Sequence, residues 1–165
     1  MKEQTNSKIL NSLIVIGITL TLIALVATPL VLTAMLKVSK TQLSIAYSSM
    51  AFVLSFCIYA CAVPYVIALF NLKTIYKLLT GENAFSPIVA QKFKTISTCA
   101  FAEAIIFIVA NLFLFLVYDF YLYALTVIPL IIVPFVSITL GFLFLVMSTI
   151  FKKSVEIKEE NDLTF

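Results

Sequence analysis

Glu103 is the residue of this sequence whose chemistry most needs an explanation, because its carboxyl group stands inside a long apolar segment. It follows Ile96, where that segment begins, by seven residues, or about 10 Å along a helix. A charged side chain at such a depth in a membrane costs at least ~2.5 kcal/mol, so we expect the carboxyl to face other helices and to be protonated or hydrogen-bonded. The candidate partners are the hydroxyl groups of Ser55, Tyr59, Thr21 and Thr28.

Cys99 and Asn111 fall on the same helical stripe as Glu103, and these three residues form a predicted intramembrane polar site. Two interpretations of this site remain open. An acid inside a membrane is by default a proton or cation site. The alternative is a polar contact that holds two helices together. We favour the contact, because no second acid accompanies Glu103 within the apolar segments.

Cys57 and Cys61 lie four residues apart on one helix face, a spacing that can hold a metal ion. We interpret them instead as small packing residues. The chain has no histidine, which removes the commonest metal ligand and every Ser-His or Cys-His nucleophile. We therefore expect no metal site, no cofactor, no catalytic residue and no enzymatic activity. Arginine is also absent, which argues against direct binding of nucleic acid.

The elements that position these side chains are predicted to be helices in lipid. The 165 residues are 62% hydrophobic and 12% charged, with a mean hydropathy of +1.14, whereas soluble domains carry roughly 25% charged residues. The apolar runs reach the ~20 residues that a helix needs to cross a membrane, and they do not alternate as the strands of a β-barrel would. The predicted fold is an all-α, polytopic, single four-helix membrane domain with helices at about 13–36, 47–72, 96–117 and 123–147.

Small and polar residues recur on one face of two of these helices, where they let helix backbones approach closely in lipid. On the first helix we expect Gly17, Thr21 and Thr28 to pack in this way, and on the fourth Ser137, Gly141 and Ser148. Pro29 follows Thr28 and is expected to bend the first helix.

The positions of the lysines predict the orientation of the chain. All 11 basic residues are lysines. Nine of them lie before the first helix, between the second and third, or after the fourth, and two lie in the first loop on the other side. Lysine accumulates on the cytoplasmic side of membrane proteins. Both termini are therefore predicted to be cytoplasmic, in a multi-pass protein of the cell membrane.

The connection between the second and third helices, residues 73–95, is predicted to be a cytoplasmic helical hairpin. The second helix continues past the bilayer and stops at Thr80-Gly81, where glycine can supply a left-handed cap. Ser86 is the predicted N-cap and Pro87 the first residue of the third helix. The hairpin is more apolar than solvation alone requires. It either lies at the headgroup boundary, which we prefer, or forms a docking surface.

The tail, residues 152–165, is short, amphipathic and charged, as a solvated helix end is, and its tip leaves room for a docking motif. Leu163 and Phe165 are large apolar residues at a place where composition ordinarily turns polar. They either dock on a partner or fold back onto Phe85 and Ile88 of the hairpin. Both alternatives remain open.

Two segments, GENAFSPIVAQKFKTIS at 81–97 and KEENDLTF at 158–165, resemble an uncharacterised bacterial family of small four-helix membrane proteins, a domain of unknown function. Its members carry a cytoplasmic turn with Gly before Phe-Ser, and a tail of Glu-Asn-x-Leu-Thr-aliphatic. The matching residues are Gly81, Phe85, Ser86, Glu160, Asn161, Leu163 and Thr164, with Phe165 in the aliphatic place. Such proteins are often encoded beside a very small helix-turn-helix regulator, so the resemblance implies a membrane partner of a transcription factor.

Two hypotheses about function follow. In the first, the chain is a non-enzymatic regulatory or sensory membrane protein that holds or releases a small cytoplasmic DNA-binding protein, with the matched residues from Phe85 to Phe165 as docking residues. In the second, it is a small transporter or toxin-immunity protein that uses Glu103 within a homo-oligomer. The predicted partners are the lipid bilayer and that regulator, and the oligomeric state is left open.

Overall fold

The computed structural model of the chain describes residues 2–38, 47–80, 86–118 and 127–162, and all of these residues except Thr80 and Ser86 are helical. The four helices are α1 (Lys2–Val38), α2 (Tyr47–Leu79), α3 (Pro87–Tyr118) and α4 (Ile128–Asp162). The prediction of an all-α fold with four long helices is confirmed.

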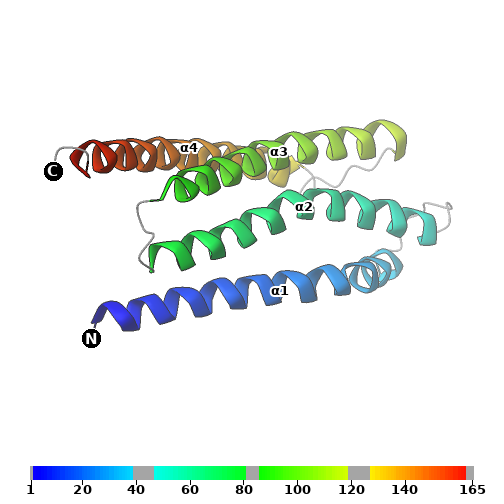
Figure 1. Cartoon of the computed structure of the whole chain (residues 1–165). Coiled ribbons are helices and arrows are strands. Elements are labelled where there is room, and N and C mark those ends of the chain that lie inside the picture. The colour runs from blue at the N-terminus through cyan, green and yellow to red at the C-terminus, as the bar shows by residue number, and fades with distance from the viewer. Residues whose placement is uncertain (1, 39–46, 81–85, 119–126, 163–165) are drawn as a thin grey trace.

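The four helices lie side by side in the order of the sequence, and each runs antiparallel to the one before it (Figure 1). α1 packs mainly on α2, α2 packs on α3, and the most extensive packing joins α3 to α4. The arrangement is therefore an open row, whereas a closed bundle would bring α4 back to α1. A side chain can be buried between neighbours in this row, but no central interior is shared by all four helices.

All four helices are long and apolar enough to cross a membrane, with mean hydropathies between 2.2 and 2.7. The apolar stretches are Asn11–Ala34, Ala51–Leu79, Pro87–Val117 and Ile128–Glu160. Their large apolar side chains point outwards, and Val26, for example, is 77% exposed. A surface of this kind is compatible with lipid and not with water. The chain is a multi-pass membrane protein.

The end of α2 and the start of α3 agree with the local sequence signals. α2 ends at Leu79, and the backbone N–H of Thr80 donates to the carbonyl of Tyr76 at 3.1 Å. α3 begins at Pro87, and the hydroxyl of Ser86 accepts a hydrogen bond from the N–H of Ile88 at 3.1 Å, as an N-cap does. Both helix boundaries are confirmed, whereas the predicted cap at Gly81 lies outside the described residues.

Two helices extend further than the apolar runs alone indicate. α1 begins at Lys2, within the polar start of the chain, and α4 continues beyond Met147 to Asp162. No glycine or proline interrupts α4 after Gly141, and Lys152 pairs with Glu156 one turn later at 3.8 Å. At its other end α4 is described from Ile128, with a proline in its first turn, and positions 123–126 of the predicted span lie outside the described residues.

The start of α1, the end of α2, the start of α3 and the end of α4 lie together at one end of the row (Figure 1). Most lysines fall there, so we call residues 2–12, 73–80, 86–95 and 148–162 the lysine-rich end. This end contains a well-packed core. Ile75 of α2 and Val89, Phe93 and Ile96 of α3 are buried together, and aromatic residues of α4 pack on them. The rings of Phe93 and Phe151 are 5.2 Å apart.

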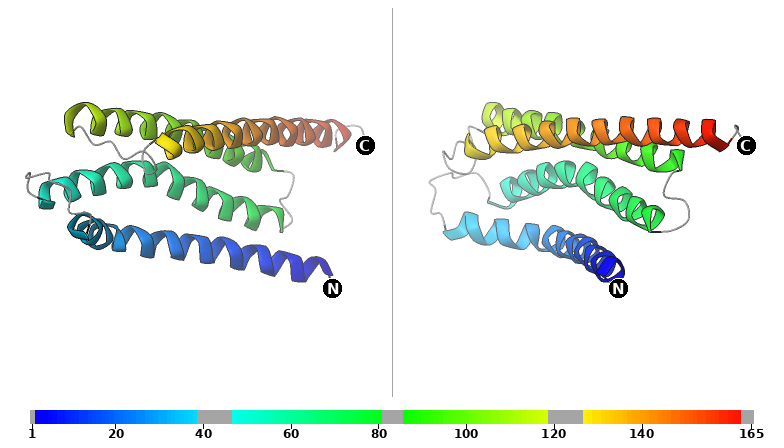
Figure 2. Two further views of the ribbon diagram at one scale, coloured as in Figure 1. Left: turned by 180° about the vertical axis from the view of Figure 1, so that it is seen from behind. Right: turned by 90° about the vertical axis from the view of Figure 1, so that its left-hand side faces the viewer.

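The predicted close packing of small residues is confirmed on α4. A Cβ atom on Gly141 would lie 2.8 Å from the ring of Phe101, and the Ser148 hydroxyl donates across to the Ala90 carbonyl of α3 at 2.7 Å. On α1 the prediction is wrong at Gly17, because within the described chain no heavy atom lies within 4 Å of the place of its Cβ. α1 bends in the part that contains Pro29 (Figure 2).

Candidate functional site

Glu103 lines a cavity of about 400 Å³ between α2, α3 and α4. The wall is mostly apolar, and the polar atoms in it come from Glu103, Asn111 and two thiols. The lining residues are Leu54, Cys57, Ile58, Cys61, Glu103, Phe107, Ala110, Asn111, Leu114, Pro129 and Val133. A volume of this size is within the range of pockets that bind small molecules.

Helical periodicity explains how the sequence brings these side chains together. Glu103, Phe107 and Asn111 follow one another at intervals of four residues, so they lie above each other on one face of α3. Cys57 and Cys61 repeat this interval on the facing side of α2. Because α3 and α4 are antiparallel, residues from the first turns of α4 meet the last turns of α3 and close the cavity there.

The hydroxyl groups predicted as partners of Glu103 are engaged elsewhere. The hydroxyl of Ser55 donates to the Ala51 carbonyl, that of Tyr59 to the Leu25 carbonyl, and those of Thr21 and Thr28 to carbonyls one turn earlier in α1. The prediction is therefore wrong for all four. In a helix within lipid, a serine or threonine hydroxyl can donate its hydrogen bond to the backbone carbonyl four residues earlier. Within the part of the chain that the structure describes, the half-buried Glu103 carboxyl has no hydrogen-bond or ion-pair partner.

Glu103 and Asn111 line the same cavity. Asn111 donates through Nδ2 to the carbonyl of Phe107 at 2.9 Å, which leaves its Oδ1 as an acceptor. Cys99 stands one turn before Glu103 on α3 but does not line the cavity. Cys57 and Cys61 do line it, although the sequence favoured a packing role for them. In the sequence, their four-residue spacing showed that they share one face of α2, but it did not show which helix this face packs against.

The thiols of all three cysteines are free. Over the described residues, no three His, Cys, Asp or Glu side chains are grouped as metal ligands would be. The polar chemistry that the cavity offers is therefore that of one carboxyl, one amide and two thiol groups in an apolar wall.

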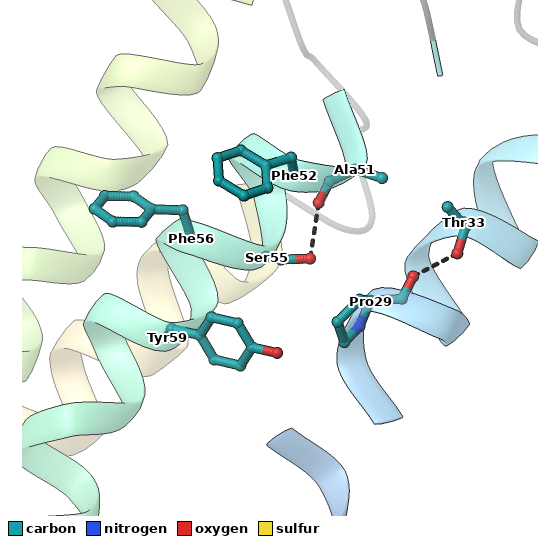
Figure 3. Close-up of a pocket in the computed structure, with 7 residues that line it drawn as sticks. All are labelled: Pro29, Thr33, Ala51, Phe52, Ser55, Phe56 and Tyr59. Atoms are coloured by element: carbon teal, nitrogen blue, oxygen red, sulfur yellow. Dashed lines mark hydrogen bonds between the residues drawn. The ribbon is translucent and has the colours of Figure 1, made fainter. Parts of the chain in front are cut away.

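A second groove of about 330 Å³ lies between α1 and α2. Figure 3 shows the ring of Tyr59 directed from α2 towards the segment of α1 around Pro29, while Phe56 points away from α1. The hydroxyls of Ser55 and Thr33 are bonded to backbone carbonyls of their own helices. With these polar groups occupied, the groove presents an apolar surface suited to lipid chains.

A third groove, of about 420 Å³, lies at the lysine-rich end between the start of α3 and the last turns of α4. This groove is more polar than the cavity around Glu103 and the groove between α1 and α2, and residues of both charges line it. Its lining residues are Pro87, Ala90, Gln91, Lys94, Ser148, Lys152, Val155, Glu156 and Glu159. We call it the charged groove.

The residues predicted to dock a partner lie close to the charged groove in sequence, but few of them are described. Ser86 caps α3 through its hydroxyl, which gives it a structural role. Glu160 is exposed near the end of α4, one residue after Glu159 of the groove. Asn161 belongs to α4, although its side chain lies outside the described part. Phe85, Leu163, Thr164 and Phe165 lie outside the described residues.

Comparison with known protein families gives a match over residues 3–165, to a family described as protein of unknown function (DUF2975). Neither a curated protein nor a solved structure matches the chain. The match spans nearly the whole chain and includes both segments on which the resemblance was based. The chain therefore belongs to the DUF2975 family.

Proposed function

We propose that the chain is a non-enzymatic regulatory membrane protein that holds a small cytoplasmic DNA-binding protein at the charged groove. The observation that carries this proposal is the groove itself, which is formed where α3 and α4 extend beyond the length that lipid requires. α4 has 35 residues and is about 52 Å long, whereas the hydrocarbon layer is about 30 Å thick. Roughly the last 20 Å of α4 is thus available to a partner in water.

The groove has the features of a site for a helix of another protein. Lys94 of α3 and Lys152 of α4 supply positive charge, and Glu156 and Glu159 of α4 supply negative charge. Charges of both signs fix the register and orientation of a docked helix and reject wrong partners. The core around Val89 and Phe93 keeps α3 and α4 in fixed relation beneath the groove, which favours binding without rearrangement.

Two further arguments support the cytoplasmic location and the class of partner. Nine of the 11 lysines belong to the side of the chain that contains the groove, as expected of a cytoplasmic face. The resemblance of residues 81–97 and 158–165 implies a neighbouring helix-turn-helix regulator, and both segments adjoin the groove in sequence.

Photo-crosslinking from Gln91, an exposed residue of the groove, tests the proposal directly. A photoreactive amino acid at this position, in cells that carry the native neighbouring genes, is expected to give an adduct with a small helix-turn-helix protein identified by mass spectrometry. The same amino acid at Phe135, which is 70% exposed on the apolar surface, is the control and is expected to give none. Adducts with lipid or with no DNA-binding protein from Gln91 would reject the proposal.

Charge reversal provides a matched test of the groove. Lys94→Glu together with Lys152→Glu is expected to lower the yield of the regulator adduct at least severalfold, because two lining charges change sign. Lys73→Glu together with Lys153→Glu reverses the same number of charges at the same end but outside the groove. Equal losses in the two double variants would show that only the net charge of this end matters.

Deletion of Asn161 to Phe165 tests the contribution of the tail. Membrane insertion is expected to stay intact, while capture of the regulator is lost. The reason is that Leu163 and Phe165, if buried by the partner, would each stabilise the complex by about 1.5–3 kcal/mol. Unchanged capture by the truncated chain would remove the tail from the docking site and leave the groove alone.

A further inference from the structure

We infer that the cavity between α2, α3 and α4 binds a lipophilic primary amine, with its nitrogen at Glu103 and its alkyl chain along α3 towards Leu114. This inference concerns the part of the molecule within the membrane. It goes beyond the proposed function and does not depend on a cytoplasmic partner.

The length of the cavity wall along α3 fits a chain-like molecule. The lining residues of α3 extend from Glu103 to Leu114, which is about 16 Å along the helix axis. Apart from Asn111 and the two thiols, the wall between these ends is made of apolar side chains from three helices, including Ile58, Phe107 and Val133. A volume of about 400 Å³ lined over that length can accommodate an alkyl chain.

The carboxyl group of Glu103 determines which head group the cavity takes. The Glu103 carboxyl has no partner in the described part of the chain. Asn111 lies eight residues further along α3, about 12 Å from Glu103, and one of its amide N–H groups already donates to the Phe107 carbonyl. When Glu103 is ionised, a head group that satisfies it must bring N–H or O–H donors, and a cationic donor forms the stronger hydrogen bonds. Carboxylate and phosphate head groups lack donors and would meet the like charge of an ionised Glu103.

A primary amine satisfies Glu103 in either protonation state of the pair. If the shared proton is on nitrogen, an ammonium group donates to the carboxylate. If the proton is on Glu103, the acid donates to the amine. In both states one proton lies between the two groups, and the apolar wall strengthens the bond between them. An acyl chain of a lipid would fill the same volume but would leave Glu103 without a partner.

Photolabelling of the full chain in phosphatidylcholine nanodiscs tests the inference with two probes that differ only in the head group. One is dodecylamine with a diazirine in its chain, and the other is the corresponding diazirine dodecanol. We expect the amine to label residues of the cavity wall about tenfold more than the alcohol does at equal concentration in the bilayer. Labelling of the lipid-facing Phe135 is expected to be equal for the two probes and serves as the internal reference.

The variant Glu103→Gln keeps the shape of the side chain and removes the acid. It is expected to lower amine labelling to the level of the alcohol, whereas Glu156→Gln, which removes an exposed carboxylate at the end of α4, is expected to leave it unchanged. Equal labelling by amine and alcohol in the unaltered chain would overturn the inference and identify the cavity as a site for acyl chains. The same conclusion would follow if a well-folded Glu103→Gln protein were labelled by the amine as strongly as before. If that variant does not fold, the comparison of the two probes on the unaltered chain decides.

Discussion

The hydroxyl of Tyr59 on α2 donates a 3.0 Å hydrogen bond to the backbone carbonyl of Leu25 on α1. Leu25 stands four residues before Pro29, and proline has no N–H with which to close that helical bond. An unsatisfied carbonyl in lipid costs several kcal/mol. Tyr59 therefore compensates for the proline that bends α1, and in doing so it joins α1 to the helix on which it mainly packs.

Tyr59→Phe is expected to destabilise the contact between α1 and α2 by about 1–2 kcal/mol, because the Leu25 carbonyl loses its donor. Thermal unfolding in detergent measures the loss. Tyr65→Phe is the control, since the Tyr65 hydroxyl forms no hydrogen bond with the described chain. In a Pro29→Ala background the backbone supplies the missing donor, so Tyr59→Phe should then cost much less. An undiminished cost there would mean that the tyrosine acts through packing.

Gly141→Ala is expected to lower stability by about 1–3 kcal/mol, because its new methyl group would overlap the Phe101 ring and push α3 from α4. Gly17→Ala should have no such effect, since its Cβ would meet open space in the described structure. Unfolding in detergent compares the two variants. Adding Phe101→Leu to Gly141→Ala should restore part of the loss, and the absence of any rescue would place the clash elsewhere.

Phe93→Ala is expected to cost about 3–5 kcal/mol, because this buried ring contacts Phe144 and Phe151 and joins α3 to α4 at the lysine-rich end. Phe135→Ala removes a ring of the same size from a surface position and should change stability little. Limited proteolysis of the last turns of α4 gives a second measurement. Equal resistance of the two variants to protease would show that the core does not hold this end together.

The orientation of the chain is tested with single cysteines in a background where Cys57, Cys61 and Cys99 are replaced by alanine. Cysteines at positions 40 and 121 are expected to react with an impermeant maleimide in intact cells, whereas one at position 82 should react only after lysis. The physical reason is the excess of lysines on the side of position 82. Labelling of position 82 from outside would reverse the predicted topology and remove the cytoplasmic partner from the proposed function.

The sequence predicted those parts of the structure that depend on local signals. The stop after Leu79 and the start at Pro87 follow from residues within one turn of each boundary, and both are found. The cavity depends instead on which helix faces which. Helical spacing placed Glu103 and Asn111 on one face, but it did not show that Cys57 and Cys61 lie opposite them. The assignment of hydroxyl partners to Glu103 failed because bonding of Ser and Thr to their own helix competes successfully with longer-range contacts.

The open row of helices has a consequence for how the protein is made. The extensive contacts between the described helices all join a helix to its neighbour in the sequence, so none of them requires the last helix to meet the first. Contacts between segments near in sequence form quickly, because little chain must be closed into a loop. A nascent chain that leaves the ribosome can therefore add one packed helix at a time, and the arrival of α4 adds the most extensive of the contacts last.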